Sequence, residues 1–309
     1  MALIKKPMTG MKDILPKEMQ IRDYLIGIIK ETYSKFGFTS IETPAVEFTP
    51  IETPCMENIA NLSNKQGGEN EKLIFKIMKR GEKLNLESAS SEADLVDGGL
   101  RYDLTVPLVR FYSNNQASLP SPFKALQIGS VWRADRPQKG RFRQFYQCDI
   151  DILGEPTNLA EIELILATTT TLGRIGFKNF KIKINDRRIL KAMAAYSGFA
   201  EESYDNVFII LDKMDKIGIE GVKEDLIANG YDAASVEKYV SLFDGIEKAD
   251  NGLLYLADTI AEFLPDEAKD NLLEIIESVN GTKNCDFDIV FDPTLVRGMS
   301  YYTGTIFEI

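Results

Sequence analysis

The chain has 309 residues, of which 44% are hydrophobic and 27% charged, with a formal net charge of −11. This length can bury a substantial core in one large domain or two smaller ones. No apolar run reaches membrane-spanning length, and no apolar stretch of a secretory signal follows the lysines of MALIKKPMTGMKD. We therefore expect a cytoplasmic protein with no membrane contact.

The chain contains no histidine, which excludes Ser/His and Cys/His nucleophilic machinery and argues against a transition-metal site. Its three cysteines, Cys55, Cys148 and Cys285, are far apart and form no CxxC pair, so neither a disulfide framework nor a zinc knuckle is indicated. Chemistry in this protein must rely on carboxylates, arginines and lysines, and no protein-held metal is expected.

Charge is distributed unevenly along the chain. Residues 191–280 hold seven Lys or Arg against twenty Asp or Glu, a net of −13, whereas the remainder holds 29 basic and 27 acidic residues, a net of +2. Such asymmetry indicates a separate module. Its surface would repel a polyphosphate backbone, while the rest of the chain could hold phosphates locally.

The first hundred residues predict one clear helix and several irregular segments. Residues 17–36 place Ile21, Tyr24 and Leu25 on one apolar stripe that Gly37 ends, which is typical of an amphipathic helix. Residues 38–48 read as a strand interrupted by Pro44. A polar loop is predicted over 56–75, a hairpin around Gly81 over 74–88, and a second polar loop over 88–99.

From residue 100 onward the pattern predicts an α+β fold. A short strand leads into a helix that starts near Pro107, and residues 124–135 and 145–154 form the two strands of a hairpin. Further elements follow at 158–175 (helix), 180–186 (strand), 187–283 (mostly helices) and 284–309 (strands). We expect an antiparallel sheet flanked by helices, with a catalytic core at 1–186 and 284–309 and an acidic helical insertion domain at 187–283.

The return strand alternates in an unusual way. In RFRQFYQCDIDILG, Gln147, Asp149 and Asp151 share one face, whereas Cys148 and Ile150 share the other, which can pack on a core. A solvent-facing sheet surface would also explain polar residues, but strands disfavour aspartate. The pattern raises the hypothesis of a binding face without proving it.

Three patches carry residues suited to chemistry. The hairpin bend holds a cluster of arginines whose guanidinium forks match phosphate oxygens, although a solvated hairpin tip would look similar. Asp103 lies two residues before Thr105, a common and weak spacing. Arg297 precedes Gly298 and the pair Tyr301–Tyr302, which suits the wall of a pocket.

Taken together, four long motifs are distinctive: GMKDILP (10–16), LRYDLTVPLVR (100–110), VWRADRPQKGRFRQFYQCDIDILG (131–154) and LVRGMSYYTG (295–304). They resemble the histidyl-tRNA synthetase family of class II aminoacyl-tRNA synthetases. The third resembles motif 2 of that class and the fourth the family's histidine-recognition signature. The resemblance covers nearly the whole chain outside the acidic segment, and residues 10–44 resemble its N-terminal strand and motif 1.

The resemblance implies how histidine would be bound. Asp103, Thr105 and Gln147 would grip the α-ammonium, and Asp151 with Tyr302 would address the imidazole, beside Tyr301. A carboxylate accepts from an imidazole N–H, and a phenol can donate or accept. Asp149 shares the face of Gln147 and Asp151, but no role is implied for it.

It also implies ATP-dependent activation of histidine, followed by transfer to tRNA(His). Arg133 would bind the α-phosphate and the amino-acid carboxylate, and Arg297 would neutralise the same charge from the other side. Asp135 would meet the adenine end and Arg141 the outer phosphates, with Mg²⁺ bound largely by phosphate oxygens. Such chemistry depends on positioning and charge neutralisation rather than on a histidine base. A homodimer formed through residues 17–50 is expected.

Two family features do not appear in the sequence, the motif 3 helix and the C-terminal anticodon-binding domain, so we expect a fragment of a longer enzyme. The acidic segment argues against a broad basic footprint for tRNA. The alternatives are a regulatory subunit of ATP phosphoribosyltransferase, which is a silent paralogue, and an amide-forming ligase of the same fold. The second alternative does not predict RGMSYYTG.

Overall fold

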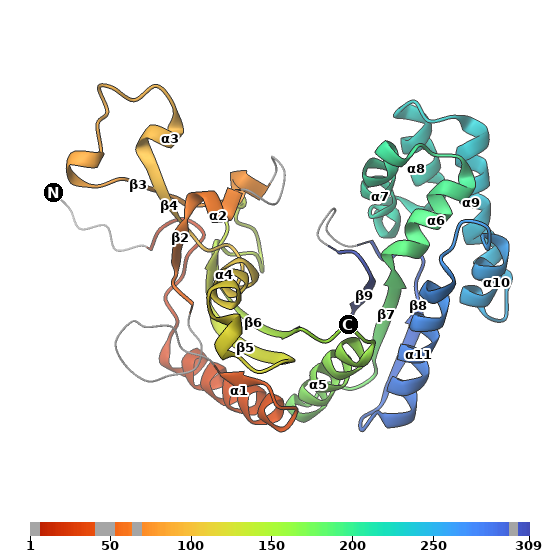
Figure 1. Cartoon of the computed structure of the whole chain (residues 1–309), viewed down its shortest axis with the longest axis horizontal. Helices are drawn as coiled ribbons and strands as arrows, with labels where there is room; N and C mark the ends of the chain where they lie inside the picture. Colours follow the sequence, from red (N-terminus) through yellow and green to blue (C-terminus); the bar gives the residue numbers. More distant parts are fainter. Residues whose placement is uncertain (1–6, 41–52, 64–69, 297–301) are drawn as a thin grey trace. The chain divides into compact units, whose positions relative to one another are not determined.

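The structure is a computed structural model that describes residues 7–40, 53–63, 70–296 and 302–309. The chain divides into two compact units, Met1–Pro156 and Thr157–Ile309. The first unit runs from red to yellow-green and the second from green to blue in Figure 1. Each unit is described by itself below.

The first unit begins with helix α1 (Pro16–Lys35), which confirms the helix predicted at 17–36. Pro16 occupies its first turn, where a missing N–H costs nothing, and Glu18 accepts from the backbone N–H of Leu15 at 3.4 Å. Gly37, with a φ of 79°, follows its end. Much of its apolar stripe is uncovered, because Tyr24 is 68% exposed.

The central sheet of this unit consists of β1 (Thr39–Ser40), β5 (Phe123–Trp132) and β6 (Gln144–Leu153). β5 and β6 are antiparallel neighbours, as predicted for the hairpin, and β1 runs parallel to β5. Of the strand predicted at 38–48, residues 41–48 lie outside the described residues.

A second small sheet lies where the sequence predicted loops. It orders β2 (Met56–Asn58), β4 (Val96–Leu100) and β3 (Lys76–Met78), all antiparallel. Short helices accompany it: α2 (Ile59–Ser63), α3 (Glu92–Leu95) and 3₁₀ turns at Asn70–Leu73 and Gly81–Lys83. The loop predicted at 56–75 is wrong where the structure describes it, and residues 64–69 lie outside the described residues. The loop predicted at 88–99 and the hairpin predicted around Gly81 are also wrong.

The physical reason is the strand VDGGL, whose glycines carry no strand signal. β3 pairs with this strand β4 and not with residues after Gly81. Gly99 lies where an added Cβ would approach Leu62 and Ile74 to 2.8 Å, so the missing side chain lets α2 and the segment before β3 pack on β4.

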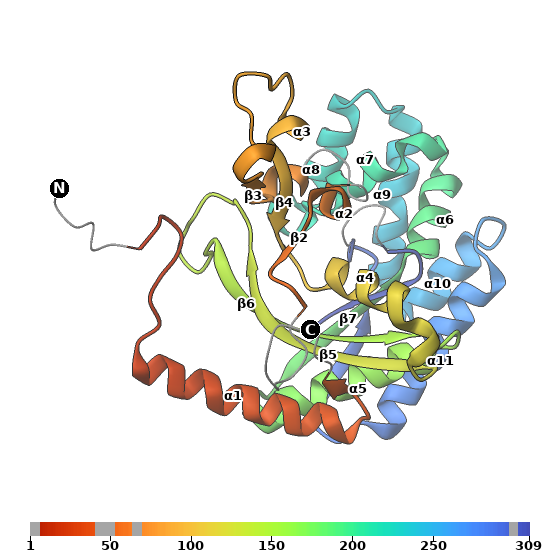
Figure 2. The same cartoon turned by 60° about the vertical axis from the view of Figure 1, so that its left-hand side comes forward.

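Helix α4 (Thr105–Asn115) follows, confirming the predicted strand-to-helix transition, and ends in a 3₁₀ turn at Gln116–Ser118. Leu108 and Phe111 pack on Phe123 and Ala125 of β5. α4 and α1 lie on opposite faces of the β5–β6 hairpin (Figure 2). Arg110 anchors α4 to β2 through two hydrogen bonds of 2.8 and 3.0 Å to Glu57.

The second unit begins with α5 (Leu159–Ile175), followed by a sheet ordered β8 (Phe287–Phe291), β7 (Phe180–Asp186) and β9 (Thr305–Glu308). β7 is parallel to β8 and antiparallel to β9. These elements confirm the predicted helix at 158–175 and the predicted strands on either side of the acidic segment.

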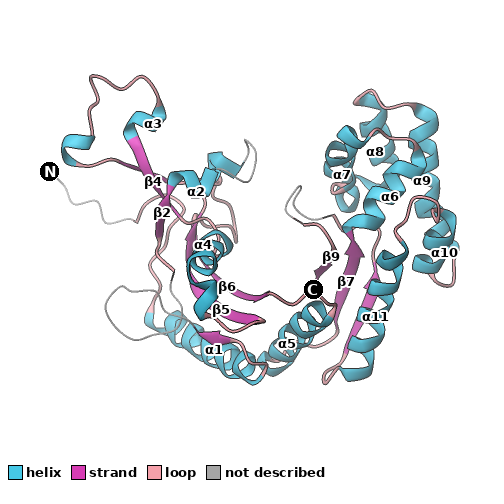
Figure 3. Ribbon diagram, viewed as in Figure 1, coloured by secondary structure: helices cyan, strands magenta, loops and turns pink. Residues whose placement is uncertain are grey.

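The acidic segment is helical, as predicted (Figure 3). Its helices are α6 (Arg187–Ser197), α7 (Tyr204–Leu211), α8 (Met214–Ala228), α9 (Ala233–Lys248), α10 (Gly252–Thr259) and α11 (Asp266–Thr282), with a 3₁₀ turn at Glu201–Ser203. Ile182 and Ile184 of β7 share one buried cluster with Leu190 and Leu272 of these helices. The domain boundary predicted at residue 187 thus falls inside one compact unit, and the insertion domain stays a prediction.

The mixture of helices with predominantly antiparallel strands confirms the α+β class. Within the described ranges, no helix combines the length and apolarity that crossing a membrane requires.

A glycine of β5 offers a test of this packing. A Cβ on Gly129 would meet the guanidinium of Arg101, which is 0% exposed and cannot swing into solvent. We expect Gly129→Ala to destabilise the first unit by about 1–3 kcal/mol, the usual cost of overpacking. Urea unfolding followed by Trp132, the single tryptophan, reports on this unit.

Gly98→Ala in β4 is the matched control, because its Cβ would come no closer than 3.5 Å to another atom. Its unfolding midpoint should stay near that of the parent. Equal effects of the two substitutions would contradict the crowding at Gly129.

Candidate active site

The first site residue lies in the turn between β4 and α4. Asp103 is 9% exposed, and its carboxylate accepts from the backbone N–H of Val106 at 3.2 Å. The carboxylate thus satisfies an otherwise unpaired donor of the first helical turn. Thr105 is half-buried and begins α4.

A buried arginine anchors this turn to the sheet. Arg101 donates from Nε to the carbonyl of Ser130 at 2.9 Å and from Nη1 to the hydroxyl of Thr53 at 3.0 Å, and it also contacts the Thr53 carbonyl. Its backbone carbonyl accepts from Trp132 at 3.0 Å. The sequence interpretation assigned Arg101 no role, although an arginine directly before the YDL of this motif was the available signal.

Gln127 is a second residue that the sequence interpretation missed. It is 1% exposed on β5, donates from Nε2 to the carbonyl of Leu104 at 3.1 Å and accepts from the hydroxyl of Thr53 at 3.3 Å. A hydrogen bond from Gln127 also lowers the pKa of Asp151 in part. Gln127 therefore connects the turn that carries Asp103 to the polar face of the hairpin.

The register of the hairpin confirms the alternation predicted for β6. Gln147, Asp149 and Asp151 lie opposite Gly129, Gln127 and Ala125, and residues directly opposite in an antiparallel pair share a face. Gln147 Oε1 and Asp151 Oδ2 are buried atoms with no hydrogen-bond partner among the described residues. These acceptors are available to a donor from a ligand.

The other face of β6 differs from its prediction in one residue. Cys148, expected to pack on a core, is exposed. It lines a cavity of about 310 Å³ with Ile21, Leu25 and Ile128, since α1 does not fully cover this side of the hairpin.

The polar face carries an excess of negative charge. Burial, followed by repulsion from Asp151 and Asp103, raises the pKa of Asp149 to about 7. Burial also raises the pKa of Asp151 to about 6 and that of Asp103 above its usual range. The face is therefore poised to receive a cation or a group with several donors.

Arg133 supplies the opposing charge. Its Nε donates to the carbonyl of Tyr102 at 3.0 Å, and its guanidinium lies 5.2 Å from the ring centroid of Phe145. Its positive charge offsets part of the rise in the pKa values of Asp103 and Asp149. Thus Arg133 lies within electrostatic range of both carboxyls.

The two predicted nucleotide contacts at the hairpin bend are paired with one another. Arg141 contacts the carboxylate of Asp135 at 2.9 Å, and Arg143 donates to the Asp135 carbonyl at 3.0 Å. The Arg141 side chain is 56% exposed, so an incoming anion can compete for it.

The remaining predicted residues belong to the second unit. Arg297 and Tyr301 lie outside the described residues, and Tyr302 is 43% exposed just before β9. In the part of the chain that the structure describes, no three His, Cys, Asp or Glu side chains gather in a way that could hold a metal ion.

Comparison with known proteins agrees with the motifs. A family model described as histidyl-tRNA synthetase matches residues 10–309. The curated histidine–tRNA ligase of Leifsonia xyli is 45% identical over 310 residues, which cover 98% of this chain and 70% of the relative. That of Phocaeicola vulgatus is 36% identical over 313 residues, covering 97% and 65%.

Solved structures give the same picture. The crystal structure of histidyl-tRNA synthetase from Nostoc sp. PCC 7120 matches 99% of this chain and 65% of its own, with a TM-score of 0.76 and 26% identity. A structure described as an ATP phosphoribosyltransferase regulatory subunit/histidyl-tRNA synthetase from Bacillus halodurans C matches 100% and 73%, with a TM-score of 0.77. At 20% identity the second match shows the fold alone.

These matches define an enzyme class, the aminoacyl-tRNA synthetases. Within that class, the chain belongs to the histidyl-tRNA synthetase family.

The raised pKa of Asp149 predicts a pH-dependent stability. The pKa of Asp149 is about 7 in the folded state and about 3.9 in an unfolded chain. Between these pH values the folded protein keeps a proton that the unfolded chain releases, so the free energy of unfolding falls as the pH rises. Asp149→Asn should therefore raise the melting temperature at pH 8, by about 3 °C or more, and change it little at pH 4.5.

Asp97→Asn, which removes an exposed carboxylate from β4, controls for the loss of one negative charge. Parallel melting profiles of Asp149→Asn and the parent from pH 4.5 to 8 would contradict the buried, repelled carboxyl.

Proposed function

We propose that the chain is the catalytic region of a histidine–tRNA ligase that activates histidine with ATP and transfers it to tRNA(His) in the cytoplasm. One observation carries the proposal: Asp103, Arg133 and the β6 residues Gln147 and Asp151 come from three segments and meet at one polar face of β5–β6. The family match over residues 10–309 supports it independently.

The charge balance of the face suits histidine. Asp103, Thr105 and Gln147 would hold the α-ammonium, for which the uncommitted Gln147 Oε1 is an acceptor. Asp151, with a pKa of about 6, is mostly ionised at pH 7 and would accept from an imidazole N–H through its unpartnered oxygen. Tyr301 and Tyr302 would complete the imidazole site.

Activation would join the histidine carboxylate to the α-phosphate of ATP as pyrophosphate leaves in line. Arg133 and Arg297 would neutralise the charge that develops there, which needs no proton-accepting histidine. Asp135 would meet the adenine end and Arg141 the outer phosphates, so ATP would have to replace the ion pair between them. Mg²⁺ would bind with ATP, mainly through phosphate oxygens.

The regulatory subunit of ATP phosphoribosyltransferase is the second candidate. It is favoured only by the fold match to a structure described with that name beside histidyl-tRNA synthetase. The ligase proposal uses more of the observations, because a purely regulatory protein has no need for the arginines at 133, 141 and 297.

Histidine-dependent exchange of pyrophosphate into ATP by the complete gene product tests the proposal. Exchange that requires histidine and no other amino acid is the expected result. A folded protein that binds histidine without exchange would overturn the ligase assignment in favour of the regulatory one.

Arg297 provides the sharpest variant for this assay. If it meets the charge that develops in the transition state, Arg297→Ala should slow exchange by about two to three orders of magnitude. Histidine binding should weaken far less, because the ammonium and imidazole contacts remain. Arg297→Lys should restore only part of the rate, because a point charge does not replace a planar fork. Exchange at the parental rate in Arg297→Ala would exclude this role.

We also propose a homodimer formed through the 17–50 region. α1 leaves Ile21 55% and Tyr24 68% exposed, and beneath it lies the apolar cavity shared with Ile128. A second copy would remove this surface from water. Ile21→Glu should therefore shift the protein from dimer to monomer in sedimentation, whereas Asp23→Asn, which lies on the side of α1 opposite Ile21, should not. A monomeric parent would contradict the proposal.

A further inference from the structure

The junction between β7 and α6 is polar, although it lies deep in the second unit. Asn185 and Asp186 are 0% exposed and Arg187 is 3% exposed. Burying three consecutive polar residues is costly unless each is committed to partners. The Arg187 side chain pairs with Asp205, and the other partners include residues at the two ends of the sequence signature LVRGMSYYTG.

Asn185 holds the N-terminal side of the signature. Its Nδ2 donates to the backbone carbonyl of Leu295 at 3.2 Å, while its Oδ1 accepts from the backbone N–H of Asp186 at 2.8 Å. Both ends of the amide are therefore used, which fixes the side chain in one orientation. Leu295 itself is 6% exposed, so its carbonyl has little access to water.

The next two residues hold the C-terminal side. The backbone N–H of Arg187 donates to the carbonyl of Gly304 at 2.9 Å, and the hydroxyl of Thr305 donates to Asp186 Oδ2 at 3.2 Å. Asp186 and Thr305 are also direct partners in the antiparallel pairing of β7 with β9.

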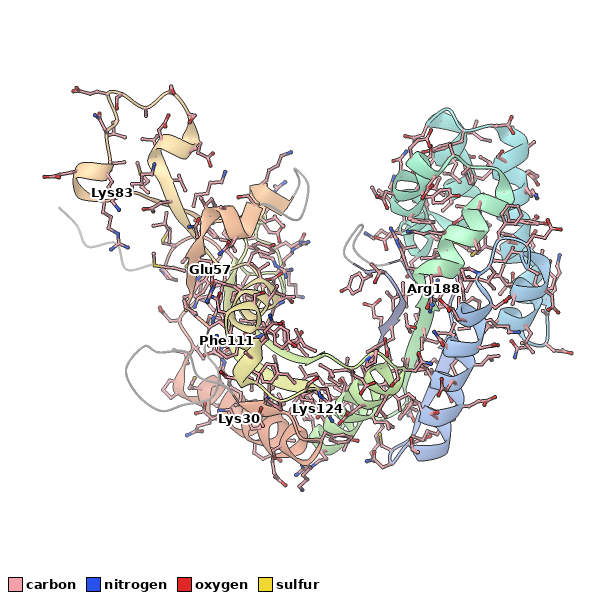
Figure 4. The ribbon with its side chains drawn as sticks, viewed as in Figure 1. Lys30, Glu57, Lys83, Phe111, Lys124 and Arg188 are labelled. Atoms are coloured by element: carbon pink, nitrogen blue, oxygen red, sulfur yellow. The ribbon has the colours of Figure 1, made fainter. Side chains whose placement is uncertain are left out.

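The Asp186 carboxylate is itself held rigidly. It caps α6 by accepting from the backbone N–H of Arg188 at 2.8 Å, and the Arg188 side chain binds it at 2.9 and 2.8 Å from Nε and Nη2. Arg188 stands at the start of α6 (Figure 4). The oxygen that meets Thr305 is thus fixed by a bidentate pair.

We propose that Asn185 and Asp186 are positioning residues for histidine recognition: they hold Leu295 and Thr305, and the hold on Thr305 limits where Tyr302 lies. The inference rests on the proposed function, because Tyr302 matters only if it meets the imidazole. Tyr302 stands three residues before Thr305, so the hold on Gly304 and Thr305 limits its movement directly.

A buried polar network contributes little net stability compared with apolar packing of the same volume, but it specifies one arrangement. Loss of one of these hydrogen bonds should therefore raise the KM for histidine more than the KM for ATP.

Thr305→Val is the most selective variant, because it removes only the hydroxyl and keeps a β-branched side chain suited to β9. In histidine-dependent exchange by the complete gene product, we expect the KM for histidine to rise about 10-fold, with the KM for ATP within about twofold of the parent. Thr305→Ser, which keeps the hydroxyl, should restore the parental KM. Asn185→Asp should raise the KM for histidine about 10- to 100-fold, because a carboxylate replaces the donor that faces Leu295.

Ser197→Ala is the matched control. Ser197 is 3% exposed in the same helix α6 and donates to the carbonyl of Met193 at 2.8 Å, far along the helix from the signature. Melting temperatures of all variants set the assay temperature, so that each is fully folded.

The outcomes separate the two levels of inference. If the parent exchanges and Thr305→Val leaves the KM for histidine at the value of Ser197→Ala, the positioning role is wrong and the ligase assignment stands. Equal rises in the KM values for histidine and ATP would also overturn it. If the folded parent shows no histidine-dependent exchange, the proposed function is wrong, and the positioning role, which rests on it, is wrong as well.

Discussion

The candidate site of the first unit depends on one buried guanidinium. Arg101 has no exposed surface, and its donors reach the carbonyl of Ser130 on β5 and Thr53 in another segment. Leaving such a charge without acceptors would cost several kcal/mol, so the segments that supply the oxygens must stay in place. Gly129 makes room for it, since any side chain there would meet the guanidinium. The turn that carries Asp103 is thereby held against the polar face of the hairpin.

The polar face brings several carboxyls together. Asp149 and Asp151 lie two residues apart on one strand, and Asp103 adds a third carboxyl within electrostatic range, against the single cation of Arg133. At an effective dielectric of about 20, two like charges 4 Å apart repel by about 4 kcal/mol. Burial is the first cause of the raised pKa values of Asp103, Asp149 and Asp151, and repulsion between the carboxyls adds to it for Asp149 and Asp151. A ligand that brings hydrogen-bond donors or positive charge to these atoms would relieve the repulsion.

Much of this arrangement could be predicted from the sequence, and the limits have physical causes. The period of two in QFYQCDIDIL predicted which residues of β6 share a face, because side-chain alternation is a local property of strands. Helices α1, α4 and α5 and the mostly helical character of 187–283 were predicted from patterns that are local in the same way. Local patterns failed at VDGGL, a strand recognisable only by what packs on its glycines.

The residues that hold the site in place could also not be predicted from local sequence patterns. Arg101 and Gln127 act through Thr53, which lies 48 and 74 residues away along the chain. Only the fold brings these residues together, so no periodicity could indicate them. The resemblance to the synthetase family named the residues proposed to touch substrates, whereas the residues that hold them in place emerged from the contacts.

In each unit a buried side-chain amide on a strand donates to a main-chain carbonyl of an irregular segment. In the first unit Gln127, buried on β5, donates to the main-chain carbonyl of Leu104, next to Asp103. In the second unit Asn185, buried on β7, donates to the main-chain carbonyl of Leu295, at the start of the signature. Apolar packing would stabilise either segment at least as well, but it tolerates sliding, because dispersion contacts have little direction. An amide that meets a specific carbonyl has both distance and angle requirements, so it fixes the register of an irregular segment against a regular strand. A buried amide at each of these positions therefore fixes where its segment lies more precisely than apolar packing would.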